Sequence, residues 1–193
     1  MNVFQILTAL LLLVFYGSYY AKKIAQRKKG IRTTQIGRGK HGISLYTEIA
    51  MGIAAFCIVC VEIISIVHDR SASPVWVRIL GLVIASLGAL LFIVAMLTMR
   101  DSWRAGVSED KTALVTNGIF KYSRNPAFLG FDLIYFGVFL VFSNWVLFLF
   151  CAFAILTLHL QIVKGEEPAM VAAFGEEYLR YRENVRRYLG RKR

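Results

Sequence analysis

Residues 127–163 read AFLGFDLIYFGVFLVFSNWVLFLFCAFAILTLHLQIV, and this run of 37 residues decides the fold. Apart from Asp132 and His159 it contains no acidic or basic side chain. As one α-helix it would be about 55 Å long, which far exceeds the ~30 Å apolar core of a bilayer. Ser143-Asn144 lie near its middle and favour a tight turn over a helix interior. The run therefore predicts a helical hairpin with spans at 127–142 and 145–163.

Three upstream runs are also long and apolar enough to cross a membrane. They cover residues 3–20, 44–67 and 75–99. Their only charged side chains are Glu48, Glu62 and Arg78. A cleaved signal peptide would carry its basic residues before its apolar run, whereas here lysines follow residue 20, so we expect the first span to be retained. The expected fold is an all-α polytopic membrane bundle with five transmembrane helices.

The basic residues define the expected orientation of this bundle. Hydrophobic residues are 57% of the chain and the net charge is +11, whereas globular proteins are ~45–50% apolar. Segments 21–43, 100–125 and 164–193 contain 21 of the 23 lysines and arginines, and five spans place all three on one side. Because such residues mark the cytoplasmic face, we expect an inner-membrane protein with its N-terminus outside and its C-terminus cytoplasmic. This placement explains the charge without a nucleic-acid partner.

The C-terminal segment predicts a basic amphipathic helix. Lys164-Gly165 are expected to end the fifth span, and Pro168 suits the first turn of a new helix. Apolar side chains then recur every three or four residues, at Val171, Phe174, Tyr178, Tyr181, Val185 and Tyr188 or Leu189. Such a helix lies on the membrane surface or folds back over the bundle, and the pattern favours the surface.

Two polar clusters flank the predicted hairpin and carry the candidate chemistry. The first is LVTNGIF at 114–120 followed by RNPAFLG at 124–130. The second contains His159, the pair Glu166-Glu167 and FGEEYLRY at 174–181. Because a hairpin returns the chain to the side where it entered, the two clusters are expected to be neighbours in space.

These motifs, in this order and spacing, resemble the isoprenylcysteine carboxyl methyltransferase family and its phospholipid methyltransferase relatives. The resemblance covers residues 100–189 and suggests two regions: three N-terminal spans with a basic loop (1–99) and a catalytic region (100–193). It implies an enzyme that transfers a methyl group from S-adenosylmethionine within a membrane-embedded fold. No G-x-G-x-x-G motif is present, which agrees with a fold without a nucleotide-binding βαβ unit.

The resemblance also assigns candidate site residues. Those matching family cofactor contacts are Leu114, Val115, Phe120, Asn125, Pro126, Ala127, Phe128 and Glu166. Those expected to take part in catalysis are Arg124, His159 and Glu167. Glu166 is expected to pair with the cofactor ammonium or ribose hydroxyls, and amides at the start of the fourth span to hold its carboxylate or hydroxyls. No metal site, nucleic acid or obligate protein partner is expected, and the partners are membrane lipids and a lipophilic or small acceptor.

The chain departs from the family pattern at several positions, which leaves the acceptor open. Asn125 replaces a histidine, Phe120 and Phe128 replace tyrosines, and Ile162 replaces an arginine, for which His159, Gln161 or Lys164 are candidate substitutes. The acceptor group is a carboxylate, a thiol or an amine. The main alternative is a non-catalytic scaffold or lipid-binding protein of the same fold. A transporter using Glu62 and Asp132 is disfavoured because no internal repeat is present.

Overall fold

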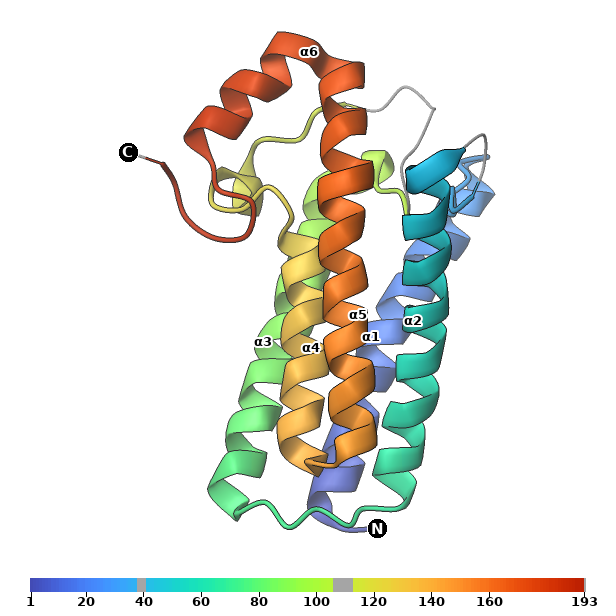
Figure 1. Cartoon of the computed structure of the whole chain (residues 1–193), viewed down its shortest axis with the longest axis vertical. Helices are drawn as coiled ribbons and strands as arrows, with labels where there is room; N and C mark the ends of the chain where they lie inside the picture. The colour runs from blue at the N-terminus through green and yellow to red at the C-terminus, as the bar shows by residue number, and fades with distance from the viewer. Residues whose placement is uncertain (38–40, 106–112, 193) are drawn as a thin grey trace.

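The computed structural model describes residues 1–37, 41–105 and 113–192 and shows an all-helical bundle (Figure 1). Its α-helices are α1 Val3–Lys28, α2 Gly42–Val67, α3 Val75–Met99, α4 Pro126–Phe142, α5 Trp145–Gln161 and α6 Glu167–Asn184. Three shorter elements are the 3-10 turns η1 Arg100–Ser102 and η2 Gly118–Lys121 and the π-helical turn η3 Ile162–Glu166. Within these ranges there are two isolated β-bridges and no strand. The all-α prediction is confirmed.

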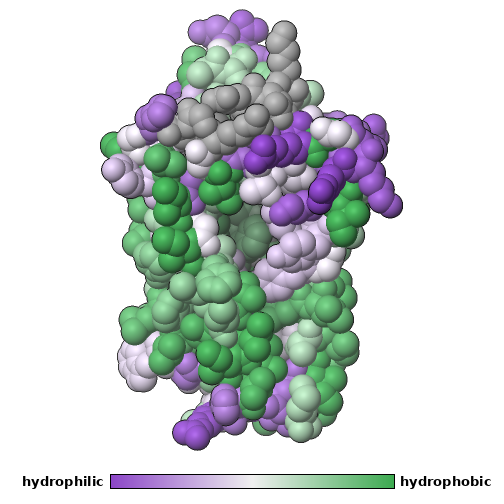
Figure 2. Space-filling model, turned by 90° about the vertical axis from the view of Figure 1, so that its right-hand side faces the viewer, coloured by the Kyte–Doolittle hydropathy of each residue, from purple (hydrophilic) through white to green (hydrophobic). Residues whose placement is uncertain are grey.

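The apolar surface of the bundle is that of an integral membrane protein. Four helical segments are long and apolar enough to cross a bilayer, and α4, with 17 residues, is a shorter apolar helix. At 1.5 Å per residue α4 is about 25 Å long, so the predicted count of five spans is approximate. Figure 2 shows a continuous apolar band along one face, with hydrophilic residues gathered mainly at the end where α6 lies. We call this the polar end.

The turn at Ser143-Asn144 forms as predicted. Ser143 adopts the left-handed conformation (φ 33°, ψ 62°). Asn144 is the N-cap of α5, and its side-chain oxygen accepts a hydrogen bond from the Leu147 amide at 2.8 Å. These two residues end one helix and begin the next, so α4 and α5 form the expected antiparallel pair.

Small residues bring α3 and α4 into direct backbone contact. The sequence pattern of Gly81, Ala85 and Ala89 indicates a close helix approach, and all three are buried. Their partners are glycines of α4. A Cβ atom added at Gly137 would lie 2.6 Å from the Ala85 nitrogen and 2.6 Å from the Gly81 carbonyl oxygen, and Gly130 meets Gly88 in the same way. No larger side chain fits at these crossings.

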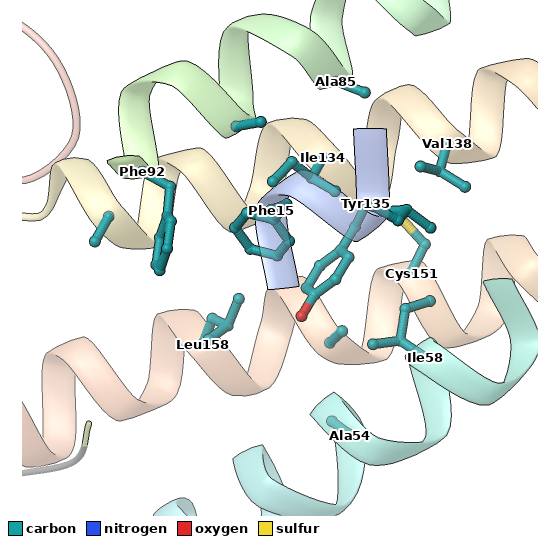
Figure 3. Close-up of a cluster of buried hydrophobic side chains, with 14 of the residues drawn as sticks. Phe15, Ala54, Ile58, Ala85, Phe92, Ile134, Tyr135, Val138, Cys151 and Leu158 are labelled. Atoms are coloured by element: carbon teal, nitrogen blue, oxygen red, sulfur yellow. The ribbon is translucent and has the colours of Figure 1, made fainter. Parts of the chain in front are cut away.

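Aromatic side chains fill the interior next to this contact. The Phe15 ring of α1 packs edge-to-face on Phe92 of α3 at 4.8 Å and on Phe131 of α4 at 5.1 Å. Figure 3 shows Phe15 and Phe92 near Tyr135 in a core that draws on all five bundle helices. Edge-to-face pairs add stability beyond the area that they bury. This cluster attaches α1 to the α3–α4 pair.

An ion pair fixes the end of the bundle opposite the polar end. Arg78 of α3 pairs with Asp69, and its guanidinium lies 4.3 Å from the centre of the Phe4 ring. Asn2 donates a second hydrogen bond to Asp69 at 2.7 Å. Burial alone would raise the pKa of Asp69, but the hydrogen bonds from Asn2 and Arg78 outweigh it and hold the pKa below its usual value. The pair thus connects α1, α3 and the loop between α2 and α3.

Replacing Arg78 by methionine is expected to destabilise the bundle by about 3 kcal/mol, because Asp69 would remain buried without its cation. The side chains of Arg78 and Asp69 are 11% and 4% exposed. Thermal unfolding in detergent, followed by tryptophan fluorescence, measures the effect. The control is Arg70→Met, an exposed arginine of the same loop. Equal midpoints for the two variants would contradict this assignment.

The helix break predicted at Lys164-Gly165 is wrong. The chain continues from α5 into α6 through the π-helical turn, in which the Glu167 amide donates to the Ile162 carbonyl five residues earlier. Pro168 explains the wider turn, since its ring would clash with the carbonyl four residues before it in a regular α-helix. The sharp bend comes later, at Gly175 (φ 51°, ψ −126°), a backbone conformation that glycine tolerates best.

The C-terminal tail folds back over the bundle, and the favoured prediction of a surface helix is wrong. Helix α6 ends at Asn184. Beyond it the Arg186 carbonyl accepts from the Arg124 amide at 3.1 Å, and the Gly190 amide donates to the Tyr122 carbonyl at 2.7 Å. The predicted apolar face therefore does not extend to Leu189, which is 67% exposed. These contacts satisfy backbone groups just before α4 that a surface helix would leave unpaired.

Candidate active site

The two polar clusters meet at the polar end, as the predicted hairpin requires. Arg124, just before α4, lies 3.0 Å from Glu167 at the start of α6, measured from Nη1 to Oε1. The Arg124 guanidinium also donates to the Tyr178 hydroxyl at 2.9 Å. Segments 124–130 and 166–181 therefore contact each other directly.

Glu167 is the centre of a buried ion cluster. Its carboxylate receives two hydrogen bonds from Arg187, at 2.8 Å to Oε1 and 2.9 Å to Oε2, in addition to the contact with Arg124. The bond to Glu167 raises the pKa of Arg187 above its usual value. With two guanidinium groups on one carboxylate, Glu167 is stabilised in its ionised form. Arg124 is 6% exposed, so its charge is largely committed to this cluster.

Glu166 belongs to a different cluster, on the side facing α2. The Gln161 amide donates to Glu166 at 3.3 Å and to Glu48 of α2 at 3.3 Å. Gln161 and Glu166 are five residues apart, the spacing of a π-helical turn. Gly165 leaves the necessary space, since a Cβ atom there would lie 2.9 Å from the Gln161 amide nitrogen. Glu48 is fully buried and accepts from the Gly37 amide at 2.7 Å.

Asn125 occupies the predicted N-cap position of α4 but does not cap the helix. Its side chain makes no capping hydrogen bond and donates instead to the Arg187 carbonyl at 3.2 Å. Its backbone amide donates to the same carbonyl at 3.2 Å. The folded-back tail therefore uses an amide that was expected to be open to the cofactor.

The other candidate cofactor residues line the approach to α4. Phe120 is buried, and its carbonyl accepts from the Tyr181 hydroxyl at 2.6 Å. Pro126 and Ala127 are buried in the first turn of α4, and Phe128 is half-buried. Leu114 and Val115 are half-buried in the segment that precedes η2.

His159 lies apart from both carboxylates. Its Nδ1 is 2.5 Å from the Tyr188 hydroxyl, and the two rings stack with centres 5.9 Å apart. Both residues line a cavity of about 560 Å³ between α4 and α5. Ile162 is fully buried and Lys164 exposed, so of the three candidate substitutes for the family arginine only His159 lines this cavity. No group of three or more His, Cys, Asp or Glu side chains suited to a metal ion occurs among the described residues.

Three residues of these clusters are absent from the sequence-based site: Glu48, Gln161 as a ligand of Glu166, and Arg187. Glu48 carries the one usable signal, because a carboxylate within an apolar span is rarely without a function. Arg187 is one of several tail arginines, and only the return of the tail to α4 distinguishes it.

Comparison with known proteins agrees with this arrangement. Residues 76–177 match the family described as Phospholipid methyltransferase. The match begins at the start of α3 and ends within α6, and it covers more than half of the chain. The chain belongs to this family. Its membership confirms the resemblance, and the matched stretch contains the α4–α5 hairpin, the π-helical turn and both carboxylates.

Curated relatives of this phospholipid methyltransferase family member are more distant. The protein-S-isoprenylcysteine O-methyltransferase of Xenopus laevis is 26% identical over 113 residues, which are 57% of this chain and 39% of that protein. The enzyme of the same name from Homo sapiens is 26% identical, with 57% and 40% covered. That from Schizosaccharomyces pombe is 33% identical over 72 residues, with 37% and 30% covered. The chain thus spans less than half the length of these relatives.

Proposed function

We propose that this protein is a membrane methyltransferase that transfers a methyl group from S-adenosylmethionine to a lipophilic or small acceptor. The observation that carries the proposal is the meeting, at the polar end, of the two segments through which the chain matches its family. In this proposal residues 100–193 form the catalytic region. The polar end faces the cytoplasm, because most of the lysines and arginines belong to its segments.

The residues of the polar end fit this cofactor. Gln161 is fully buried, and its Oε1 has no hydrogen-bond partner within the described chain. An unpaired buried oxygen is costly, and a cofactor ammonium or ribose hydroxyl would satisfy it. Glu166 lies beside it and adds a negative charge for the ammonium. Phe120 and Phe128, at the start of α4, supply aromatic surface for the adenine or the sulfonium.

Positioning accounts for most of the catalysis in this proposal. When bound, the cofactor supplies an activated methyl group, and transfer is an in-line displacement that depends on alignment. The Glu167 cluster holds the start of α4, the start of α6 and the tail in one arrangement. We assign Arg124 and Glu167 to this positioning role, because their charges already neutralise each other. His159 lies on the acceptor side, at the cavity between α4 and α5.

Isothermal titration of the detergent-purified protein with S-adenosylhomocysteine tests the cofactor site. We expect saturable binding that weakens at least tenfold in Glu166→Gln, or about 1.4 kcal/mol, because a charge-assisted hydrogen bond is removed. The matched control is Glu176→Gln, an exposed glutamate of α6, which should bind as the wild type does. Absence of binding, or equal affinity in both variants, would refute the proposed site.

A non-catalytic protein of the same fold is the second candidate. Its support is the commitment of Arg124 to Glu167 together with the burial of Ile162, which leave no free arginine beside the carboxylate pair. Binding of S-adenosylhomocysteine without transfer to any membrane lipid or thiol would favour it.

A further inference from the structure

The cavity between α4 and α5 opens on the surface of the bundle below the ion cluster. Its lining consists of Leu129, Asp132, Ala152, Ile155, Leu156, His159 and Tyr188. Four of these side chains are apolar, and α4 and α5 belong to the apolar bundle. A volume of about 560 Å³ is in the range of a site for one small ligand. The lining therefore offers an apolar groove with three polar groups.

Asp132 is the polar group that requires explanation. Its Oδ1 is buried and has no hydrogen-bond partner within the part of the chain that the structure describes. A carboxyl group within an apolar helix is costly and usually marks a functional site. Its free oxygen accepts a hydrogen bond whether or not the group is protonated. The groove is therefore complementary to a ligand that donates a hydrogen bond.

His159 and Tyr188 close the polar side of the groove. Their short contact fixes the imidazole through Nδ1, and among the described residues no hydrogen bond engages Nε2. Tyr188 directly follows Arg187, whose guanidinium holds Glu167. The groove is thus joined through the tail to the cluster that positions the proposed cofactor site.

No lysine or arginine lines this groove. The nearest arginines in the chain, Arg124 and Arg187, are paired with Glu167. An anionic headgroup would face Asp132 without a cation to balance it, and like charges at short range disfavour binding. Charge complementarity therefore selects against a carboxylate and for a headgroup that carries a proton.

We propose that this groove is the acceptor site, and that its ligand is an amphiphile with one hydrocarbon chain and a protic N–H, O–H or S–H headgroup. The proposal rests on the proposed function. During transfer the acceptor heteroatom forms a bond to the methyl carbon, and the sulfonium–methyl bond breaks with its electron pair passing to sulfur. The headgroup proton passes to the Asp132 carboxylate. The products are the methylated amphiphile, S-adenosylhomocysteine and one proton.

Transfer from methyl-labelled S-adenosylmethionine to a panel of probes tests the proposal. The purified protein is incubated separately with dodecylamine, dodecanol, dodecanethiol and dodecanoate at pH 8. We expect label on at least one protic probe and none on dodecanoate. Asp132→Asn should reduce labelling at least a hundredfold and leave the affinity for S-adenosylhomocysteine within twofold. The control is Asp101→Asn, an exposed carboxylate paired with Lys29, which should label as the wild type does.

A second variant keeps the test independent of the stability of Asp132→Asn. Leu156→Trp enlarges a half-exposed side chain on the groove wall and should block all labelling while S-adenosylhomocysteine still binds. Label on dodecanoate alone, no label on any protic probe despite cofactor binding, or full activity in Asp132→Asn or in Leu156→Trp would overturn the proposal. Failure of the wild type to bind S-adenosylhomocysteine would instead refute the proposed function.

Discussion

Substituting leucine for Gly137 is expected to prevent the bundle from assembling in its native form. Any side chain there begins 2.6 Å from the Ala85 nitrogen and the Gly81 carbonyl oxygen. Both atoms are backbone, so no rotamer change relieves the overlap and α3 must move away from α4. Overpacking a core usually costs 1–3 kcal/mol, and here about 3 kcal/mol or more is expected. The neighbouring contact of Gly88 with Gly130 would be lost as well.

The matched control is Gly52→Leu in α2, where an added Cβ meets nothing within 4 Å. Size-exclusion chromatography and thermal unfolding in the same detergent compare the two variants. Gly137→Leu should give little monodisperse protein or a midpoint at least 8 °C lower, since each kcal/mol corresponds to about 2–4 °C at this chain length. Gly52→Leu should match the wild type. Equal behaviour of the two variants would contradict the α3–α4 contact.

The second large effect is expected from Glu167→Gln. This change leaves Arg124, which is 6% exposed, without its anion. Removing one partner of a buried ion pair costs about 3–5 kcal/mol. Arg187 is 33% exposed, so water compensates part of its loss and the lower half of that range is expected. Because the cluster positions the start of α4, affinity for S-adenosylhomocysteine should also fall at least tenfold.

Thermal unfolding and calorimetric titration measure the two effects in the same sample. Glu183→Gln, an exposed glutamate of α6, controls for the change in net charge. The double variant Glu167→Gln with Arg124→Gln should regain part of the stability, since the unpaired cation is gone, but not the affinity. A single variant as stable as the control would show that the cluster does not hold the polar end together.

The elements that follow from local sequence were predictable. Ser143-Asn144 indicates a turn, and an apolar run too long for one span requires it. The small residues Gly81 and Ala85 indicate a close crossing. Their partner Gly137 was not identified, because a glycine within an apolar run becomes informative only once its opposite helix is known. The meeting of Arg124 with the Glu166-Glu167 pair followed from the hairpin topology.

The remainder depends on tertiary contacts. Lys164-Gly165 favour a break, but a π-helical turn also accommodates Pro168, and Gly165 serves to make room for Gln161. The tail satisfies the amides of Arg124 and Asn125, which hydrophobic periodicity does not register. For the same reason the sequence assigns Asn125 to capping, whereas its side chain binds the tail.

The most direct test of the central claim is methyl transfer itself. The purified protein is incubated with methyl-labelled S-adenosylmethionine and extracted native membrane lipids, and the labelled products are separated by chromatography. We predict label in a lipophilic product, suppressed by S-adenosylhomocysteine and reduced at least tenfold in Glu166→Gln but not in Glu176→Gln. A protein that is folded and monodisperse yet transfers no label to any fraction would contradict the account.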